Sequence, residues 1–518
     1  MNLKERSMSL MFDKVLNVSS GQILPERPPA GLAFLNGVCE HMGIEYSSLD
    51  LNLFINQELD EETWVRLEQV TPFYPVTDES VLSIVDDVLD KFCDRVQSFD
   101  PDLIMVSVLS YYQNFWAQSF LEKLKSLGLK AKVMIGGTGI GVPLGDETKD
   151  TFAKMLLRKE LIDYYVLGEG DMILQSFLRD GTISPGINHR NTRALPGTET
   201  ETWAQQIDEL DQCPTPSYKQ MDLDSYPNEL GVTGSRGCVR RCTFCDVGHY
   251  WKKFRFRSGE SIAREIEQHY RDTGRTRYVF TDSLINGSLK SFRDMLATMA
   301  KVREDNNGMP ELQLLGQFII RPSRFHPEQM FREMRTAGIH ELSIGVESGS
   351  EKVREHIGKK FSNEDIDWHM EMCSKYGIQN NLLMMVGYPT ETEEDFNESM
   401  DMLDRYQKYT IDKTVRHVNE SYPLVLLKNT PLHHMADDLD ISGFNDQEYF
   451  NVTWVSGKNP KLTIHERFKR FVRWQRRLIK LGYWRPQTLR VIIRELMRQI
   501  ENLSERTLSD RVKTDILS

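Results

Sequence analysis

Short apolar runs alternate with helical patterns along most of this 518-residue chain. The runs at 103–108 and 132–135 have the length of buried strands, whereas the apolar residues from 116 to 127 recur at helical spacing. Strands that alternate with helices in this way build mostly parallel sheets with helices on both faces. The pattern therefore predicts an α/β protein.

The first 200 residues predict a doubly wound sheet. Strands are expected at 14–18, 44–51, 103–108, 132–135 and 164–167, with helices at 31–42 and 116–127. Sheets of this kind bind ligands outside the carboxyl ends of their strands. Glycines stand at two of these ends, as Gly136-Gly137 and as Gly168-Glu169-Gly170, where backbone without a Cβ can approach a large flat ligand closely.

A second alternation of strands and helices follows from residue 225. Strands are expected at 230–233 and 278–280 and within 341–350 and 382–392, with helices at 259–270 and 291–303. Parallel barrels place their sites at the carboxyl ends of the strands. The residues expected at these ends are Asp282, Glu347 and Gly387. We expect them to converge on one pocket with a loop at 238–245 that carries three cysteines. The alternatives are that Asp282 is a helix N-cap and that Gly345 and Gly387 serve only as turn residues.

Three of the seven cysteines stand together as Cys238, Cys242 and Cys245, with the spacing C-x3-C-x2-C. Three thiolates at this spacing suit a [4Fe–4S] cluster, in which the fourth iron is open to another ligand. The alternative is a zinc knuckle, which needs a fourth protein ligand, and His249 is the nearby candidate. The odd number of cysteines indicates a reducing compartment, and we expect a cytoplasmic protein.

The cysteine loop, with Phe244 as the aromatic residue before the last cysteine, resembles the signature of radical S-adenosylmethionine (SAM) enzymes. The segments 281–283, 345–349 ("GxESG") and 387–392 ("GxPxET") resemble later motifs of the same family. The resemblance implies a partial (β/α)6 barrel and a [4Fe–4S] cluster on Cys238, Cys242 and Cys245. It implies SAM contacts from Phe244, Asp282, Gly345, Glu347, Ser348, Gly387 and Pro389. It also implies an external electron donor of the flavodoxin or ferredoxin type and cleavage of SAM to a 5′-deoxyadenosyl radical.

The region ahead of the barrel resembles the cobalamin-binding-type domain of a large branch of radical SAM proteins. The resemblance rests on "PPxGLAxL" at 28–35, on Gly136-Gly137 and on "DYxxxGEGD" at 163–171. It implies cobalamin contacts at Gly136, Gly137, Gly168, Glu169 and Gly170. Domains that ligate cobalt from below carry D-x-H-x-x-G after the first strand, but here residues 19–22 read Ser-Ser-Gly-Gln. Two alternatives stay open, a cobalamin held without a protein histidine and a domain that kept its fold but lost the cofactor.

These resemblances divide the chain into a cobalamin-binding-like domain at 1–200, a linker at 201–224, a partial barrel at 225–436 and a mainly helical extension at 437–518. Cys39 and Cys93 alone precede the linker and no cysteine follows Cys373, so the second clusters of other radical SAM branches lack their ligands here. We therefore expect a single cluster. Cys39, Cys93 and Cys373 are expected to be small buried hydrophobic residues in helices.

Composition fits a large enzyme, with 40% hydrophobic and 27% charged residues and a net charge of −12 that argues against general affinity for nucleic acid. No apolar stretch approaches the roughly 20 residues of a membrane span, and no secretory signal is visible. The segment 461–500 differs, since it carries twelve Lys and Arg against two Asp and Glu. Two amphipathic helices at 464–481 and 486–503, packed on the barrel, are the favoured interpretation, and a surface for RNA is the alternative.

The expected function is that of a radical SAM enzyme acting on a small molecule. The reaction is cobalamin-dependent methylation or another C–H functionalisation, such as a rearrangement, cyclisation or oxidation. One alternative is an RNA-modifying radical SAM enzyme that uses the basic segment. The other is a non-catalytic protein that senses cobalamin or redox state.

Overall fold

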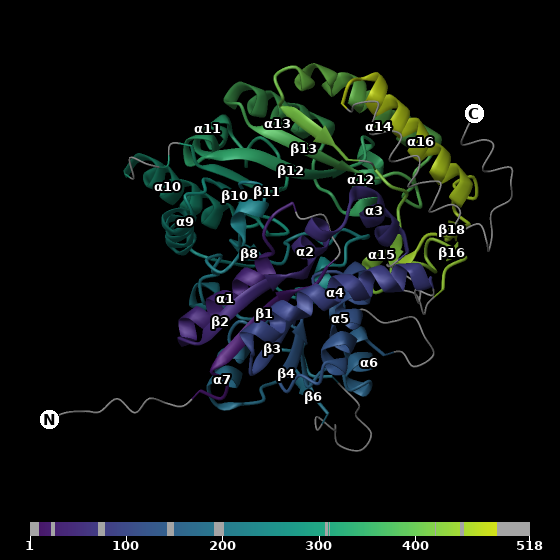
Figure 1. Ribbon diagram of the computed structural model, residues 1–518. Coiled ribbons are helices and arrows are strands. Elements are labelled where there is room, and N and C mark those ends of the chain that lie inside the picture. The colour runs from purple at the N-terminus through teal and green to yellow at the C-terminus, as the bar shows by residue number, and fades with distance from the viewer. Residues whose placement is uncertain are drawn as a thin grey trace. The chain divides into compact units, whose positions relative to one another are not determined.

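The computed structural model describes residues 10–21, 26–70, 78–141, 150–190, 201–305, 309, 311–419, 421–445 and 450–483 (Figure 1). The chain forms two compact units. The first comprises Met1–Val232 with Arg264–Thr281, and the second comprises Thr233–Ala263 with Asp282–Ser518. The predicted domain boundaries at 200, 224 and 436 stay predictions.

The first unit is built on a six-stranded sheet with the order β2-β1-β3-β4-β5-β6 (Figure 1). Its strands are β1 (Lys14–Ser19), β2 (Glu45–Asp50), β3 (Leu103–Ser107), β4 (Lys132–Gly136), β5 (Tyr164–Val166) and β6 (Ile187–His189). Strands β1 to β5 are parallel, which confirms the five predicted strands, whereas the unpredicted β6 is antiparallel to β5. The order is that of doubly wound sheets whose strand order reverses between β1 and β3.

Helices cover both faces of this sheet, because successive strand residues belong to different cores. Leu16 and Val106 lie in a core shared with the helices after β2, whereas Val15 and Met105 lie in a core on the other face. The helices are α1 (Ala30–Met42), α2 (Leu51–Glu58), α3 (Glu61–Val70), α4 (Glu79–Phe99), α5 (Asn114–Ser126), α6 (Phe152–Arg158) and α7 (Ile173–Asp180). The predicted helices at 31–42 and 116–127 are thus confirmed as α1 and α5.

Helices α2, α3 and α4 occupy the connection between β2 and β3, where the sequence pattern predicts no element. Helix α4 begins at the N-cap Asp78, whose carboxylate accepts the backbone N–H of Ser80 at 2.9 Å and of Val81 at 3.4 Å. Apolar residues recur along α4 from Val81 to Val96 and are buried. In the sequence, acidic residues stand between these apolar positions and make the helical pattern hard to recognise. On the helix, these acidic residues belong to the solvent face.

A second sheet has the order β14-β13-β12-β11-β10-β7. Its strands are β7 (Leu230–Val232), β10 (Arg277–Phe280), β11 (Gln313–Phe318), β12 (Ile339–Glu347), β13 (Gln379–Met384) and β14 (Val415–Val418). Strand β10 is parallel to β7, and β11 to β14 form a parallel series. The connecting helices are α9 (Gly259–Thr273), α10 (Leu289–Asp305), α11 (Glu328–Ala337), α12 (Glu351–Ile357), α13 (Asn363–Tyr376) and α14 (Glu393–Tyr406). Six parallel strands alternating with helices confirm the predicted (β/α)6 pattern.

The described residues after β14, which include part of the predicted C-terminal extension, contain short strands as well as helices. Strand β15 (Leu426–Leu427) pairs with β17 (Phe450–Asn451), and β16 (Ile441–Ser442) pairs with β18 (Val455–Ser456). Helix α15 (Pro431–His434) is short, and α16 (Ile464–Lys480) packs on α14. Helix α16 confirms the predicted helix at 464–481, whereas the predicted helix at 486–503 lies outside the described residues.

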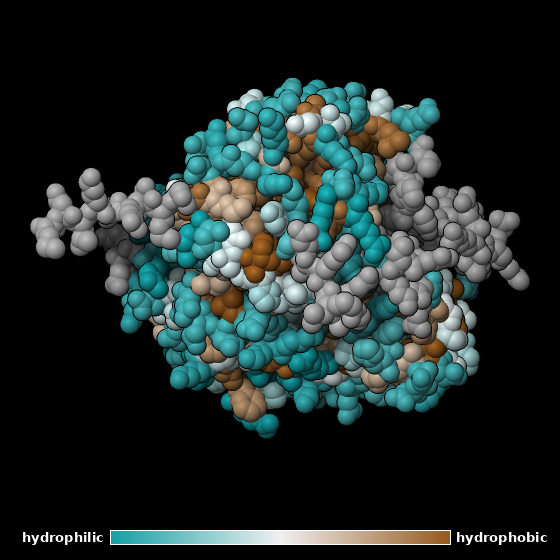
Figure 2. Space-filling view, turned by 90° about the horizontal axis from the view of Figure 1, so that it is seen from below, coloured by the Kyte–Doolittle hydropathy of each residue, from teal (hydrophilic) through white to brown (hydrophobic). Residues whose placement is uncertain are grey.

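The remaining cysteines have the environments predicted for them. Cys39 lies in α1, Cys93 in α4 and Cys373 in α13, and all three are free and buried. Within the described ranges, every helix is too short or too polar to cross a bilayer. On the face seen in Figure 2, hydrophilic side chains predominate and apolar ones form separate patches.

Candidate functional site

The cysteine loop is closed at its base by a pair of two-residue strands. Strand β8 (Ser235–Arg236) pairs antiparallel with β9 (Arg255–Phe256), so the residues between them leave the barrel as one excursion. Gly237 begins this excursion with a φ of +90°, and a Cβ there would lie 2.5 Å from the carbonyl oxygen of Lys253. Only glycine fits this turn, which sets the direction of the loop that carries the three cysteines.

The three cysteine thiols lie within electrostatic reach of one another. Burial raises the pKa of Cys245 to about 11, and the charges of Cys242 and Cys238 add to the rise. Burial also raises the pKa of Cys242, which Cys238 raises further and Lys359 lowers. The Cys245 N–H donates to the Cys242 carbonyl at 3.1 Å, which holds the second half of the motif in a turn. Three half-buried thiols that share one loop fit the ligand set of a [4Fe–4S] cluster.

A site for a single ion has different requirements. The zinc knuckle would gather the three cysteines and His249 of the short helix α8 (Val247–Tyr250) around one metal. In the part of the chain that the structure describes, no three His, Cys, Asp or Glu side chains are grouped so that they could hold one metal ion. In a four-iron cluster each thiolate binds a different iron of the cube. Thiols that are not gathered around a single ion therefore still suit a cluster.

Asp282 holds the start of the cysteine loop. Its side chain is 4% exposed, and its carboxylate accepts the backbone N–H of Gly234 at 2.8 Å. Burial raises the pKa of Asp282 to about 7, against the opposing effect of hydrogen bonds from Ser235 and Gly234. The next helix, α10, begins only at Leu289, so the N-cap alternative for Asp282 is wrong. A carboxylate with so high a pKa is suited to receive a cationic group.

Glu347 ends β12 in a left-handed conformation with a φ of +70°. The pairing of β12 with β13 shifts register between Gly345 and Glu347, and such a bulge redirects the side chain that follows it. The Glu347 carboxylate lies 3.0 Å from the Lys359 ammonium, which also donates to the Gly345 carbonyl at 2.8 Å. A Cβ on Gly345 would lie 2.4 Å from Glu347 Oε1, so glycine leaves the space that this ion pair occupies.

Lys359 is a site residue that the sequence reasoning missed. Burial by itself would lower its pKa, but the charges of Glu347, Cys242 and Cys238 raise it. The residue before it, Gly358, has a φ of +93° and lies against the backbone of the cysteine loop. A lysine just after a helix looks like a surface residue in a linear reading, and only its burial between Glu347 and the thiols distinguishes it.

The loop from Gly387 to Thr392 is attached to the cysteine loop by a hydroxyl contact. Tyr388 Oη lies 2.9 Å from Thr243 Oγ1, and it also donates to the His356 carbonyl at 3.1 Å. Gly387 has a φ of +80° and its N–H donates to Glu391 Oε1 at 3.1 Å. The Pro389 carbonyl accepts from Asn459 Nδ2 at 3.2 Å. Gly387 is thus a turn residue, as the alternative predicts. The residue after this turn, Tyr388, contacts the cysteine loop through Thr243.

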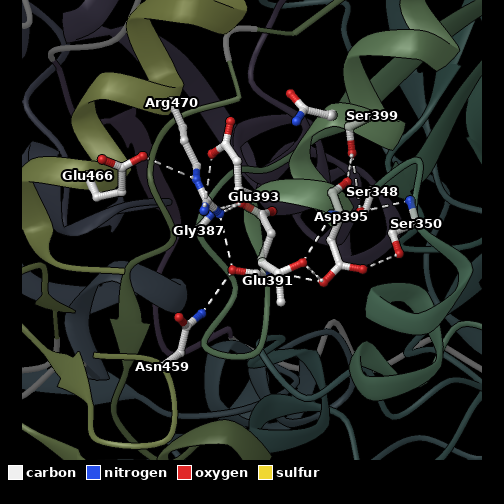
Figure 3. Close-up of polar contacts among 12 residues, drawn as sticks. Ser348, Ser350, Gly387, Glu391, Glu393, Asp395, Ser399, Asn459, Glu466 and Arg470 are labelled. Atoms are coloured by element: carbon white, nitrogen blue, oxygen red, sulfur yellow. Dashed lines mark hydrogen bonds and ion pairs between the residues drawn. The ribbon is translucent and has the colours of Figure 1, made fainter. Parts of the chain in front are cut away.

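Two further predicted SAM contacts lie within the packing of the second unit. The Ser348 hydroxyl lies 3.3 Å from the Ser399 hydroxyl on α14 and accepts the Ser350 N–H at 3.1 Å (Figure 3). Phe244 and Cys242 pack against an apolar cluster that includes Tyr388 and Trp454. The SAM-binding roles of these residues stay predictions.

The predicted cobalamin residues lie at the carboxyl edge of the first sheet, where several serve the fold itself. Gly137 has a φ of +106°, and a Cβ there would lie 2.2 Å from the Val108 carbonyl oxygen. Gly168 has a φ of +89°, and a Cβ there would lie 3.1 Å from the backbone of Ala204. Glu169 accepts the N–H of Ile207. A Cβ on Gly136 would have no neighbour closer than 3.7 Å, and one on Gly170 would meet Leu174 at 3.3 Å.

Apolar side chains are exposed at the same edge. Leu109, two residues beyond β3, is 69% exposed, and Tyr112 in the following turn is also exposed. Trp203 is exposed as well, next to Gly141 after β4. An edge that combines exposed apolar groups with open backbone at Gly136 fits a large flat ligand such as a corrin.

No histidine stands where a lower cobalt ligand would come from. Ser20, directly after β1, is buried and donates its hydroxyl to the Gln113 carbonyl at 3.2 Å, and Gln113 donates back to the Ser20 carbonyl. Gly21 faces Ile55, where a Cβ would lie 2.4 Å from Cδ1. His41 is exposed in the last turn of α1. The described residues after β1 are thus committed to contacts within the first unit.

Comparison with known proteins identifies the barrel. Residues 232–403 match the radical SAM superfamily. This part of the chain is a radical SAM domain. The cofactors of this superfamily are a [4Fe–4S] cluster and SAM, and the cysteine loop and the residues around it fit them.

Two curated relatives cover most of the chain. An uncharacterized methyltransferase of Pyrococcus horikoshii, PH0819, is 23% identical over 330 residues, which are 61% of this chain and 68% of the relative. The cytidylyl-2-hydroxyethylphosphonate methyltransferase of Streptomyces wedmorensis is 22% identical over 404 residues, which are 70% of this chain and 69% of the relative.

Two solved structures have the same fold. The radical SAM methyltransferase TsrM of Kitasatospora setae, solved with its tryptophan substrate and a SAM analogue, aligns with a TM-score of 0.61 at 16% identity and covers 89% of this chain and 88% of its own. The cobalamin-dependent radical SAM enzyme OxsB, solved with aqua-cobalamin and SAM, aligns with a TM-score of 0.63 at 15% identity and covers 98% and 70%. At these identities the likeness concerns the fold.

Proposed function

We propose that this radical SAM enzyme is a cobalamin-dependent methyltransferase that acts on a small molecule. The observation that carries the proposal is the exposed apolar edge at the carboxyl ends of the first sheet, formed by Leu109, Tyr112 and Trp203. Large apolar side chains exposed together at the carboxyl edge of such a sheet are typical of a ligand-binding site. The corrin ring of cobalamin is a partner with a suitably large apolar surface.

The relatives support the methyl-transfer part of the proposal. Both curated relatives are named methyltransferases, and TsrM is a methyltransferase as well. OxsB and TsrM were solved with cobalamin, and both share their fold with this chain over most of its length. The phosphonate, tryptophan and other substrates of these proteins differ, so they leave the small-molecule substrate of this chain undefined.

We assign roles in the barrel to its own side chains. Cys238, Cys242 and Cys245 bind the cluster, which, when present, supplies the electron that cleaves SAM. Asp282 receives the SAM ammonium group, because its carboxyl group is buried and a cation beside it would stabilise the charged form. Lys359 and Glu347 orient the charged end of SAM, and apolar packing around Phe244 excludes water from the loop.

We assign the lower face of cobalamin to residues without a coordinating side chain. Ser20 and Gln113 bind each other after β1 and β3, so a corrin there would rest on a closed, uncharged surface. The external reductant is of the flavodoxin or ferredoxin type, and the protein acts in the cytoplasm, as expected from its cysteine content.

The RNA-modifying alternative is less well supported. Arg473 lies 2.6 Å from Glu393, and Arg477 is paired with Asp404, so these two basic residues of α16 already have acidic partners on or beside α14. Their charges are largely compensated, which weakens attraction to phosphates. The burial of Phe471 and other apolar residues of α16 supports the packed-helix interpretation for the first of the two predicted helices, at 464–481.

The test is anaerobic reconstitution with iron, sulfide and cobalamin, followed by reduction in the presence of SAM. We expect a bound-cobalamin spectrum and formation of 5′-deoxyadenosine that a Cys242→Ala variant lacks. Leu109→Asp places a charge at the apolar edge and should lower retained cobalamin at least about tenfold without changing SAM cleavage. Leu82→Asp, at an exposed apolar residue of α4, is the matched control.

The outcomes separate the alternatives. SAM cleavage without cobalamin binding in the wild type would refute the cobalamin proposal and leave a radical SAM enzyme of another reaction type. Equal cobalamin retention by the Leu109 and Leu82 variants would refute the proposed edge. Cobalamin binding without any SAM cleavage would favour the sensing alternative.

A further inference from the structure

A buried ion pair connects the C-terminal helix α16 to the loop at 387–392 (Figure 3). Arg470 of α16 is 4% exposed and Glu391 of the loop is 1% exposed. Arg470 Nη1 lies 2.6 Å from Glu391 Oε1 and also donates to the Glu391 carbonyl at 3.1 Å. One guanidinium nitrogen therefore binds both the side chain and the backbone of the same loop residue.

Glu391 in turn sets the shape of the loop. Its Oε1 accepts the Gly387 N–H at 3.1 Å, and its own N–H donates to the Tyr388 carbonyl at 2.8 Å. Asn459 Nδ2 donates to the Glu391 carbonyl at 2.9 Å and to the Pro389 carbonyl at 3.2 Å. Four bonds thus close the loop on itself and onto the extension, and all of them pass through or beside Glu391.

The surroundings make the charge of Arg470 important to Glu391. Burial raises the pKa of Glu391 to about 7 even though Arg470 opposes the rise. Arg470 also faces Glu393 at 3.5 Å and Glu466 at 3.7 Å, so it lies among three carboxylates (Figure 3). Glu393 is also paired with Arg473, whereas Arg470 is the cation that contacts Glu391. A buried carboxylate that loses its cation either takes up a proton or moves toward water. Either change alters the acceptor that holds Gly387.

The loop transmits its position to the cysteines. Tyr388, next to Gly387, contacts the Thr243 hydroxyl at 2.9 Å, and Thr243 stands between Cys242 and Cys245. The Thr243 backbone is fixed on both sides, since its N–H donates to Ile357 at 2.9 Å and its carbonyl accepts from Leu432 at 2.6 Å. A shift of Tyr388 therefore acts on the cysteine loop through its hydroxyl contact with Thr243.

Apolar contacts from the extension reinforce the same connection. Ile441, Trp454 and Leu462 of the extension belong to the cluster that contains Tyr388, and Cys242 and Phe244 pack against it. Helix α16 itself is anchored independently of Arg470, through buried Phe468, Phe471, Trp474 and Leu478. The helix should thus remain packed when Arg470 is replaced, while the loop loses its anchor.

We propose that Arg470 is a positioning residue for SAM binding, acting through Glu391 and the loop at 387–392 on the SAM pocket and the cysteine loop. The C-terminal extension is then part of the SAM site, although none of its residues belongs to the radical SAM match at 232–403. The proposal rests on the assignment of the Gly387 loop to SAM, and it is independent of cobalamin and of the methyl acceptor.

The test compares Arg470→Met, Arg470→Lys and the double variant Glu391→Gln/Arg470→Met with the wild type. Arg473→Met is the matched control, because Arg473 lies on the same helix and pairs with Glu393, a partner that Arg470 shares, without contacting the loop. Each reconstituted protein is assayed for 5′-deoxyadenosine formation against SAM concentration. Titration of the reduced cluster with SAM, followed by electron paramagnetic resonance, gives a second measure that needs no turnover.

We expect Arg470→Met to raise the KM for SAM about tenfold and to change kcat less than about twofold, because the substitution weakens SAM binding and leaves the chemical step intact. In the titration, the SAM concentration at which half of the reduced cluster gives the spectrum of the SAM-bound form should rise by the same factor. Arg470→Lys keeps the charge but lacks the guanidinium nitrogens that face Glu393 and Glu466, so its KM should rise about threefold. Arg473→Met should behave like the wild type.

The double variant decides whether Arg470 acts through Glu391. A glutamine at 391 is uncharged and still accepts the Gly387 N–H, so the double variant should return KM to within about threefold of the wild type. An unrescued double variant, or equal KM values for the Arg470→Met and Arg473→Met variants, would overturn the proposal. If Arg470→Met fails to fold, Arg470→Lys and the double variant carry the same comparison. Failure of methyl transfer alone would affect only the proposed function.

Discussion

Asp282→Asn should change the stability of the protein in a way that reverses sign with pH. In the folded protein the pKa of Asp282 is raised to about 7 by burial, from a reference value of 3.8. The folded state therefore holds a proton that the unfolded state has released, throughout the interval between these two values. Stability contributed by the protonated carboxyl is present below about pH 4 and is lost as the pH rises to about 7.

The size of the effect follows from the pKa shift. About three pKa units correspond to about 4 kcal/mol of folding free energy, which the wild type forfeits by pH 8. Asparagine avoids this loss and its oxygen can still accept the Gly234 N–H, but its amide hydrogens lack an acceptor, at a cost of about 1–3 kcal/mol. Asp282→Asn should thus stabilise the protein by about 1–3 kcal/mol at pH 8 and destabilise it by a similar amount at pH 4.

The assay is urea unfolding of the cluster-free protein at a series of pH values, with the transition of the second unit followed for both proteins. The difference in midpoint should change steadily between pH 4 and about 7 and level off above. A difference that is constant with pH would refute the reasoning, because the titration of Asp282 would then be the same in both states. Since we assign Asp282 to the SAM ammonium group, the same substitution should weaken SAM binding while it stabilises the protein at pH 8.

Three further predictions test other parts of the structure. Gly137→Ala should destabilise the first unit by about 3 kcal/mol in urea unfolding, because of its close backbone neighbour and positive φ, whereas Gly128→Ala, which has open space around it, should cost about 1 kcal/mol; similar costs at both positions would contradict this. Lys359→Met leaves Glu347 without its partner and should reduce 5′-deoxyadenosine formation at least about tenfold, and wild-type rates would argue against a role for Lys359 in the site. His369 is buried with its pKa lowered to about 4, so the wild type should lose up to about 3 kcal/mol as the pH falls from 6.5 toward 4, and His369→Gln should show a shallower acid limb in the same pH series.

The carboxyl-end residues could be predicted because their signals are local. A strand followed by a glycine, an acidic residue or a cysteine is visible within about ten residues of sequence, and parallel topology brings such ends to one edge. Cys238, Asp282, Glu347 and Gly387 stand at or just after such ends, and the resemblance of their segments to radical SAM motifs singles them out.

Other features of the structure could not be predicted from local sequence patterns. Strand β6 is three residues long and depends on its pairing with β5, and helix α4 carries its apolar stripe between many charges. Lys359 is distinguished only by burial, which depends on residues far from it in sequence. The Arg470–Glu391 pair joins residues 79 positions apart, and in sequence Arg470 is one of many basic residues in a basic segment.

The sequence by itself determined the chemistry available to this protein. The cysteine spacing, the order of strands and helices, and the polar residues at strand ends follow from short-range patterns, since periodicity and ligand spacing are properties of neighbouring residues. Only the tertiary structure decided which charges are paired and buried. Burial and ion pairing depend on what the fold packs against a side chain. For this reason Arg470 of the basic helix α16 pairs with Glu391 of the loop at 387–392, while Arg473 and Arg477 pair with acidic residues of α14.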